Sequence, residues 1–333
     1  MRFKRKAVIF LSLLIILVFS FLLSISIGTV YFPFKEIMEN IGGRVLGNHT
    51  SYNPIIIDIR LPRVLLALLV GASLGGVGAI FQSLFMNPMA DAYIIGVSSG
   101  AALGAVSAIV FRLEVQFLGL SSIPIFAFIG GIVTVLLVYS ISYRGQHNSM
   151  LNLLLAGLAI NAFLSGLMSL LLLLSDTTLH GSIYWLMGGF SGRGWQHVKI
   201  ILPYFIICSI VLSMYTREAN IMLLGEEQAQ NLGVNTHQVR RVLIIFSSLL
   251  TASAVSVSGV IGFVGLIIPH ILRRIIGPDN RILFPASLFG GAVLLVLSDL
   301  VARIALSPNE IPVGIVTSLI GAPFFLFLLK KKS

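Results

Sequence analysis

The sequence predicts an all-helical protein that crosses a membrane many times, and its composition and long apolar runs are the basis for this prediction. The chain has 333 residues, of which 57% are hydrophobic and only 10% are charged. A soluble domain has about 25% charged residues, so this composition is typical of a bilayer protein. The apolar runs are continuous over roughly 20 residues, which suits helices, whereas membrane strands alternate over about ten.

About ten segments, all within one transmembrane domain over 1–333, are apolar enough to be membrane spans. Basic residues at 2–6 precede the first run, which is too long for a signal peptide and lacks a clear cleavage site, so we expect a retained span. We expect residues 31–60 to form a polar connection outside the membrane. The expected spans are 7–27, 62–84, 93–111, 124–142, 150–174, 198–215, 240–260, 262–276, 282–305 and 312–329.

Glycines cluster within several of these spans. A glycine in a membrane helix lets the backbone of a neighbouring helix approach closely, so such clusters usually mark packing faces. We therefore expect close helix contacts at Gly71, Gly75, Gly76, Gly78, Gly100, Gly104, Gly130, Gly131, Gly290 and Gly291.

The net charge of +10, from 22 basic and 12 acidic residues, is interpreted as an orientation signal and not as a nucleic-acid surface. Lys and Arg are enriched in the cytoplasmic connections of membrane proteins. With the N-terminus inside, most basic residues fall on the cytoplasmic side. Both termini and the polar stretch 223–241 are then cytoplasmic.

The single cysteine, Cys208, excludes an intrachain disulfide.

The chain carries no recognisable catalytic motif. It has no GxxxxGK[ST] phosphate loop and no HExxH pair, and its six histidines lack the spacing of metal ligands. Ser98 and Ser99 have no histidine placed to activate a serine nucleophile, which disfavours an intramembrane enzyme. We therefore expect no catalytic residue, no metal and no cofactor on this chain.

Carboxylates are also scarce in the predicted spans. Among the 12 acidic residues only Asp299 lies inside one, and Arg303 follows four residues later, so we expect an ion pair along one helix face. Ion-coupled secondary transporters usually keep acids in the membrane because a buried charge is tolerated only where it is used. The sequence thus disfavours that class and indicates an external source of energy.

The most polar interruption between two spans is the stretch 223–241. Gly225 and Gly233 bracket seven residues that begin with Glu226 and Glu227. Acidic side chains in the first turn interact favourably with the helix dipole, and a glycine commonly ends a helix. We therefore expect a short helix here. On composition alone it could be a solvated connector or a docking element.

Several motifs resemble those of the iron-siderophore and vitamin B12 permease family of ABC importers, the FecCD family. The stretch from Gly225 to Val234 looks like the family's coupling loop. The resemblance extends from about residue 60 to the C-terminus, and it rests on LPR at 61–63, NP at 87–88, GVSSG at 96–100, GFVGLIIPHILRR at 262–274 and LIGAPF at 319–324.

The resemblance implies two docking surfaces. A cytoplasmic ATPase subunit, which would carry ATP and Mg, is expected to bind the coupling residues Gly225, Glu226, Glu227, Ala229, Leu232, Gly233 and Val234. At the outer side, the family pattern pairs Arg60, Arg63 and Arg303 with glutamates of a substrate-binding protein or lipoprotein. Without the resemblance, these arginines could simply reach from the membrane to the interface.

The segment 176–196 contains both tryptophans and resembles the family's short gate helix. The resemblance assigns the gate and pathway to Asp176, Thr177, Thr178, Trp185, Gly188 and Gly189. A glycine pair would let such a gate hinge. Aromatic residues at a membrane interface can also serve only to anchor the protein at a fixed depth.

Taken together, the resemblance implies the permease of a type II ABC importer in the bacterial cytoplasmic membrane. The expected assembly has two permease subunits, identical or different, two ATPases and one binding protein, surrounded by membrane lipid and without nucleic acid. The expected cargo is an iron(III)-siderophore, with vitamin B12 (cobalamin) or haem as the alternative.

Overall fold

The structure is a computed structural model that describes residues 2–28, 30–45, 53–116, 119, 121–142, 150–175 and 178–330. Over these residues every regular element is helical. The elements are α1 (Arg2–Ser26), α2 (Phe34–Val45), η2 (Ile55–Arg60), α3 (Leu61–Leu84), α4 (Val97–Val110), α5 (Ser122–Ser142), α6 (Met150–Leu173), α7 (Leu179–Leu186), α8 (Trp195–Met214), α9 (Thr216–Met222), α10 (Glu226–Asn231), α11 (Thr236–Ser258), α12 (Val264–Ile276), α13 (Asn280–Ile304) and α14 (Val313–Lys330).

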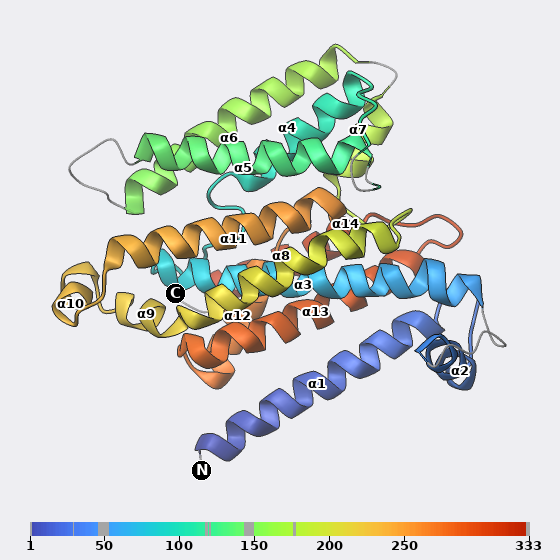
Figure 1. The fold of residues 1–333 in the computed structure, drawn as a ribbon, viewed down its shortest axis with the longest axis horizontal. Coiled ribbons are helices and arrows are strands. Elements are labelled where there is room, and N and C mark those ends of the chain that lie inside the picture. The colour runs from blue at the N-terminus through green and yellow to red at the C-terminus, as the bar shows by residue number, and fades with distance from the viewer. Residues whose placement is uncertain are drawn as a thin grey trace.

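The all-helical membrane fold expected from the sequence is confirmed. In the described part of the chain, seven helical stretches are long and apolar enough to cross a membrane, namely α1, η2 with α3, α5, α6, α8, α11 and α13. Three shorter helices, α4, α12 and α14, cover the other expected spans. Figure 1 shows the long helices lying roughly side by side, with α10 and both chain termini towards one end and α2 and α7 towards the other. We call these the α10 end and the α7 end.

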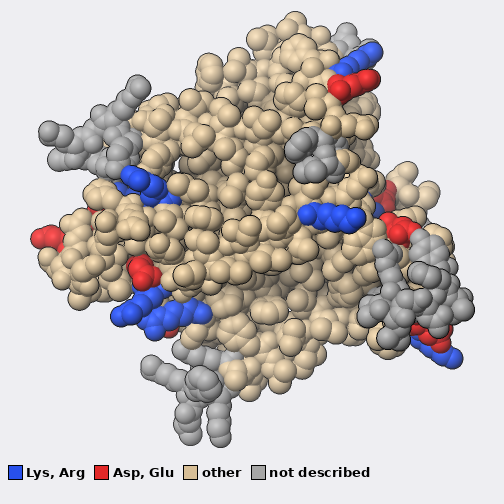
Figure 2. Space-filling model, in the orientation of Figure 1, with Lys and Arg blue, Asp and Glu red and all other residues tan. Residues whose placement is uncertain are grey.

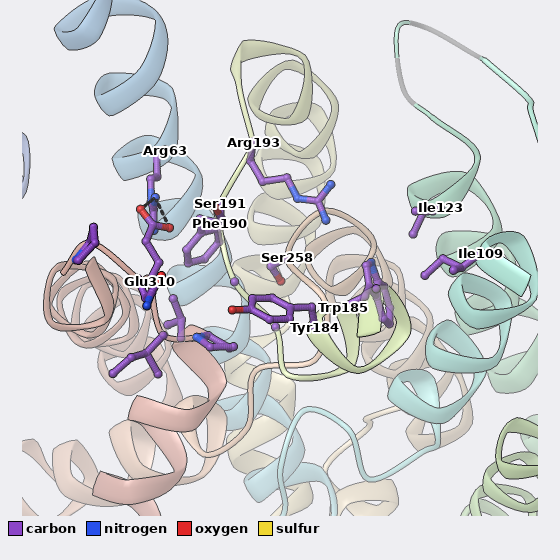
Figure 3. A pocket seen from close by; sticks show the side chains of 18 residues that line it. Arg63, Ile109, Ile123, Tyr184, Trp185, Phe190, Ser191, Arg193, Ser258 and Glu310 are labelled. Carbon is purple, nitrogen blue, oxygen red and sulfur yellow. Dashed lines mark hydrogen bonds and ion pairs between the residues drawn. The ribbon is translucent and has the colours of Figure 1, made fainter. Parts of the chain in front are cut away.

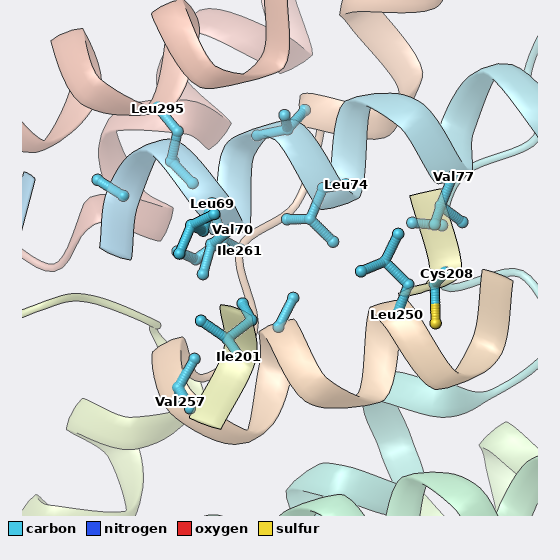
Figure 4. Packing of buried hydrophobic residues seen from close by; sticks show 14 of the residues in the cluster. Leu69, Val70, Leu74, Val77, Ile201, Cys208, Leu250, Val257, Ile261 and Leu295 are labelled. Carbon is cyan, nitrogen blue, oxygen red and sulfur yellow. The ribbon is translucent and has the colours of Figure 1, made fainter. Parts of the chain in front are cut away.

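Helix α3 is the centre of the bundle. In the most apolar 18-residue window of η2 with α3, 89% of the residues are buried inside the bundle. In the corresponding window of α6 only 17% are buried. A helix that is apolar all round is stable only when neighbours surround it, and α3 contacts α1, α8, α11, α12 and α13. In Figure 4 its residues Leu69, Leu74 and Val77 face side chains of α8 and α11, including the buried Cys208.

The glycine clusters are contact sites between helices, as expected. A Cβ placed on Gly71 would overlap the carbonyl oxygen of Gly291, and one on Gly291 would overlap the carbonyl oxygen of Gly71. Gly75 meets the Ser287 carbonyl in the same way, so α3 and α13 touch backbone to backbone. Gly100 and Gly130 form the equivalent contact between α4 and α5.

A second layer of the bundle consists of α4, α5 and α6, with α7 at one end (Figure 1). These helices contact one another, and α11 joins them to the α3 group through contacts with α4 and α5. Helix α6 exposes Leu151, Leu155, Leu158 and Phe163 along its length. Such a face suits lipid or another membrane protein.

The expected polar connection at 31–60 is wrong from residue 55 onward. The segment contains α2, and η2 continues directly into α3, which buries Ile56, Ile57 and Arg60. Three consecutive isoleucines precede Asp58, so the run is apolar enough to extend the helix. The Trp195 indole donates to the Ile57 carbonyl oxygen at 2.9 Å and fixes this extension to α8.

Two non-helical segments, 85–96 and 259–263, meet inside the bundle. The Tyr93 hydroxyl donates to the Ile261 carbonyl oxygen at 2.8 Å and accepts from the Ile261 amide at 3.2 Å. Asp91 lies close to Gly265 near the start of α12 and accepts a hydrogen bond from the Ala92 amide at 2.6 Å. Non-helical backbone at membrane depth is tolerated where protein surrounds it. Helix α4 therefore begins at Val97 and not at the expected residue 93.

The backbone contact between α3 and α13 leads to a prediction about the stability of a Gly291 variant. Substituting Gly291→Leu should lower the free energy of unfolding by about 3 kcal/mol or more, since an overpacked site must push the two helices apart. Gly166→Leu on α6 is the matched control, because nothing lies within 4 Å of a Cβ added there. Thermal unfolding of the purified variants measures both. Equal losses at the two positions would contradict the assigned contact.

Candidate functional site

The α7 end carries the predicted gate, and α7 is a helix of eight residues there. Thr178 is its N-terminal cap residue, and the hydroxyls of Thr178 and Ser175 are hydrogen bonded. The predicted gate residues Asp176 and Thr177 lie outside the described residues. Trp185 is buried, with 7% of its surface exposed.

The glycines after α7 attach it to two other helices. Gly189 donates its amide hydrogen to the Ser258 carbonyl at 2.7 Å, and the Gly314 amide donates to the Gly188 carbonyl at 3.3 Å. Gly188 has a φ of +66°, which favours glycine, and a Cβ there would overlap the Val260 carbonyl. We call this connection of α7 to the end of α11 and the start of α14 the glycine strap. It places Gly188 and Gly189 where a change in α11 or α14 would reach α7.

A cavity of about 540 Å³ lies beside the glycine strap. Its wall includes Trp185, Gly188 and Gly189, so the structure brings three predicted gate residues together around one space (Figure 3). The charged side chains in the wall are Arg63, Arg193 and Glu310. A cavity of this size is in the usual range for small-molecule sites, about 300–1,000 Å³.

Arg63, one of the three predicted docking arginines, is held by two carboxylates. It donates to Asp299 at 2.8 and 3.0 Å and to Glu310 at 2.8 and 3.0 Å. Asp299 is fully buried and also pairs with Arg303 at 3.2 Å, so the expected pair along α13 is confirmed. Arg303 further donates to the Ser24 carbonyl at 2.8 Å. The cluster thus joins α1, α3, α13 and the segment before α14.

Arg60, the remaining docking candidate, also faces inward. It donates to the carbonyl oxygens of Ile25 at 2.6 Å and Ser26 at 3.1 Å, and to that of Val30. Its guanidinium lies 4.8 Å from the centre of the Phe32 ring. Arg60, Arg63 and Arg303 are between 6% and 8% exposed, so all three are engaged within the chain. Docking on them stays a prediction.

Glu310 was not expected from the sequence. It is 247 residues from Arg63, and no local pattern marks it as a partner. Burial alone would raise the pKa of Glu310, but the hydrogen bonds and charge of Arg63, a hydrogen bond with Ser191 and the charge of Arg303 lower that pKa below its ordinary value. The carboxylate is therefore ionised, and more than a third of its side chain is exposed.

At the opposite end, the short helix expected between Gly225 and Gly233 is confirmed as α10, with Glu226 and Glu227 in its first turn. Gly225 and Gly233 have φ values of +102° and +82°. Glu226 pairs with Arg240 at 2.7 Å. These contacts fold α10 back onto the start of α11.

The surface of α10 combines charge with exposed apolar side chains. Ala229 is fully buried, whereas Leu232 is 62% exposed and Leu224 is 55% exposed. Val234 is partly buried and Glu227 is exposed. A turn that exposes two leucines outside the apolar bundle has the composition of a docking element more than of a solvated connector.

Polar side chains join the α10 end to the bundle. Asn220 of α9 donates to Asp279 at 2.7 Å and accepts from the Asn280 amide at 2.8 Å. Ser83 at the end of α3 donates to the Asn280 side chain at 2.8 Å. Helix α9, which leads into α10, is thereby fixed to α3 and α13.

Comparison with known proteins supports the same class. The model of the FecCD transport family matches residues 16–331. A cobalamin import system permease protein of Halobacterium salinarum is 45% identical over 84% of this chain and 74% of its own length. An Fe(3+)-citrate import system permease protein of Bacillus subtilis is 36% identical over 98% of this chain and 96% of its own length.

A solved structure agrees over the whole fold. It is described as an inward-facing conformation of a metal-chelate type ABC transporter, is 35% identical in sequence, and superposes with a TM-score of 0.85 over 98% of this chain and 99% of its own. The family match covers nearly the whole length, and the relatives are permeases of ABC importers. This chain therefore belongs to the FecCD transport family and is a transmembrane permease of the ABC importer type.

Proposed function

We propose that this permease carries an iron(III)-siderophore into the cell, using ATP hydrolysed on a partner subunit. The observation that carries the proposal is that one bundle has a short helix with two exposed leucines, α10, at one end and a cavity beside the short helix α7 and its glycine strap at the other. The ferric-citrate relative and the metal-chelate structure support an iron chelate as cargo. The identity to the cobalamin permease favours vitamin B12 as the second candidate.

In this proposal the α10 end faces the cytoplasm. Exposed arginines on the helices of that end include Arg217 of α9, Arg274 of α12 and Arg281 of α13, and Figure 2 shows basic side chains on the surface there. This fits the tendency of basic residues to lie on the cytoplasmic side. Both chain termini then lie inside, and the cavity opens on the outer side. In this proposal the protein lies in the bacterial cytoplasmic membrane as a multi-pass subunit.

The partner ATPase would bind α10 through the exposed Leu224 and Leu232 and the acidic first turn. ATP binding drives transport only if the ATPase contacts α10 differently in two states. Movement of α10 would reach the bundle through α9 and through α11, which starts directly after it. ATP and Mg would stay on the partner.

A second permease subunit would pack on an apolar face of the bundle such as that of α6. On the outer side, a substrate-binding protein would dock near Arg63. The carboxylate of Glu310 occupies Arg63 in this structure, so a docking glutamate would have to displace it or share the guanidinium.

Substituting Leu232→Asp should abolish ATPase docking without unfolding the chain, because Leu232 is 62% exposed. We expect co-purification with the ATPase subunit to fall at least about tenfold, since a charge buried at an interface costs more than 1.4 kcal/mol. Leu306→Asp, 65% exposed at the opposite end, is the matched control and should keep the ATPase bound. Normal co-purification of the Leu232 variant would refute the docking role of α10.

Substituting Glu310→Gln should free Arg63 for the binding protein while Asp299 still balances its charge. We expect the binding protein to bind the variant several-fold more tightly at low salt, and the gain to shrink as ionic strength rises. Affinity measured by surface plasmon resonance on the reconstituted permease tests this. An affinity that does not change at low salt would rule out docking on Arg63.

The cargo is tested by uptake of radioactive iron into iron-starved cells with and without this chain. We expect uptake of one ferric chelate class, citrate, hydroxamate or catecholate, to fall to background when the chain is removed. Unchanged iron uptake together with loss of cobalamin uptake would move the cargo to the second candidate. Normal uptake of all of these compounds would contradict both.

A further inference from the structure

The cavity beside the glycine strap has an unbalanced positive charge. Of its three charged wall residues, Arg63 and Glu310 pair with each other at 2.8 Å, and Arg63 is also balanced by Asp299. Arg193 has no carboxylate partner among the described ion pairs. The net charge of the wall therefore comes from Arg193.

Arg193 lies in the segment between α7 and α8, and its side chain reaches into the cavity in Figure 3. Its polar contact is with the His197 ring, at 3.3 Å between Nη1 and Nε2. Burial lowers the pKa of this guanidinium, because loss of solvent disfavours the charged form. An arginine nevertheless stays protonated, so the charge has to be balanced by something that enters the cavity.

Two buried donors in the same wall have no hydrogen-bond acceptor among the described residues. They are Nε of Arg193 and the indole Nε1 of Trp185. Buried N–H groups are almost always paired, and leaving one unpaired costs about 1–3 kcal/mol. Two such donors beside one uncompensated cation are the complement of an anionic oxygen group, which accepts hydrogen bonds and carries the missing charge.

We propose that this cavity is a subsite for a carboxylate of the transported chelate, bound by Arg193 with the Trp185 indole as a second donor. The inference rests on the proposed import function and narrows its cargo to chelates with a free carboxylate. The group would sit beside the glycine strap, between α7 and the segment that leads into α8. Glu310 does not repel it strongly, because Arg63 already holds that carboxylate.

The test reads the cavity directly and needs no transport. The probe is Tyr184→Cys, since Tyr184 is 60% exposed and lines the cavity. The substitution Cys208→Ser removes the buried native cysteine. The full-length protein in zwitterionic lipid nanodiscs is labelled with an anionic and a cationic methanethiosulfonate reagent. The ratio of the two rates, corrected for reactivity with a free thiol, reports the local charge.

We expect Arg193→Gln to lower the anionic-to-cationic rate ratio about tenfold and Arg193→Lys to preserve it, because the lysine keeps the charge. Arg112→Gln is the matched control, since Arg112 is an exposed arginine at the same end that does not line this cavity. A ratio that Arg193→Gln leaves unchanged, or that the Arg112 variant lowers equally, would overturn the proposal.

Protection by citrate identifies the ligand group. We expect millimolar citrate to slow labelling at position 184 at least about threefold relative to chloride of equal ionic strength, and to lose this effect in Arg193→Gln. Protection by inorganic phosphate but not by citrate would reassign the site to a phosphate group, such as a lipid headgroup, and overturn the carboxylate assignment. Protection by neither would leave only solvent in the cavity and also overturn it. Failure of iron uptake with citrate protection intact would instead count against the import function alone.

Discussion

The backbone contact between α3 and α13 determines how the centre of the bundle is arranged. Without side chains at Gly71 and Gly291 the two helices approach until backbone atoms touch, and this contact sets the position of everything that α3 and α13 carry. It brings Arg63 of α3 within hydrogen-bond distance of Asp299 of α13, 236 residues away. Two arginines can be buried on this surface only because that carboxylate lies between them, since an unpaired buried charge costs several kcal/mol.

A single helix connects the α10 end of the molecule with the glycine strap. Helix α11 starts shortly after α10, and the Asn235 side chain caps it by accepting from the Gln238 amide. It ends at Ser258 in the glycine strap. Its 23 residues span about 35 Å at 1.5 Å per residue. Most of the helix is buried, so it is held laterally by α3, α5 and α8. Under the proposed function, a displacement at α10 would be carried along α11 to the strap, with the side-chain bonds between α9 and α13 as a second route.

Sequence patterns predicted the features that depend on neighbours along the chain. Gly225, Gly233 and two acids specify α10 within nine residues, and the spacing of Asp299 and Arg303 places both on one helix face. What the sequence did not reveal depends on distant partners. Nothing near Arg63 shows that Glu310 will meet it. Arginines at the end of a span are usually exposed, so the burial of Arg60, Arg63 and Arg303 follows only from carbonyl groups and carboxylates that the fold brings to them.

Glu310 and Gly314 lie four residues apart, and this short distance joins two proposed events. Glu310 is bound to Arg63, where a binding protein is proposed to dock, while the Gly314 amide is bound to Gly188 in the glycine strap. If a partner carboxylate takes Arg63, the segment 310–314 loses one of its anchors directly beside the strap. Helix α7 could then respond to docking through these few residues of backbone, without a movement of the bundle. Signals from the ATPase would reach the same strap from the other side, through Ser258 at the end of α11.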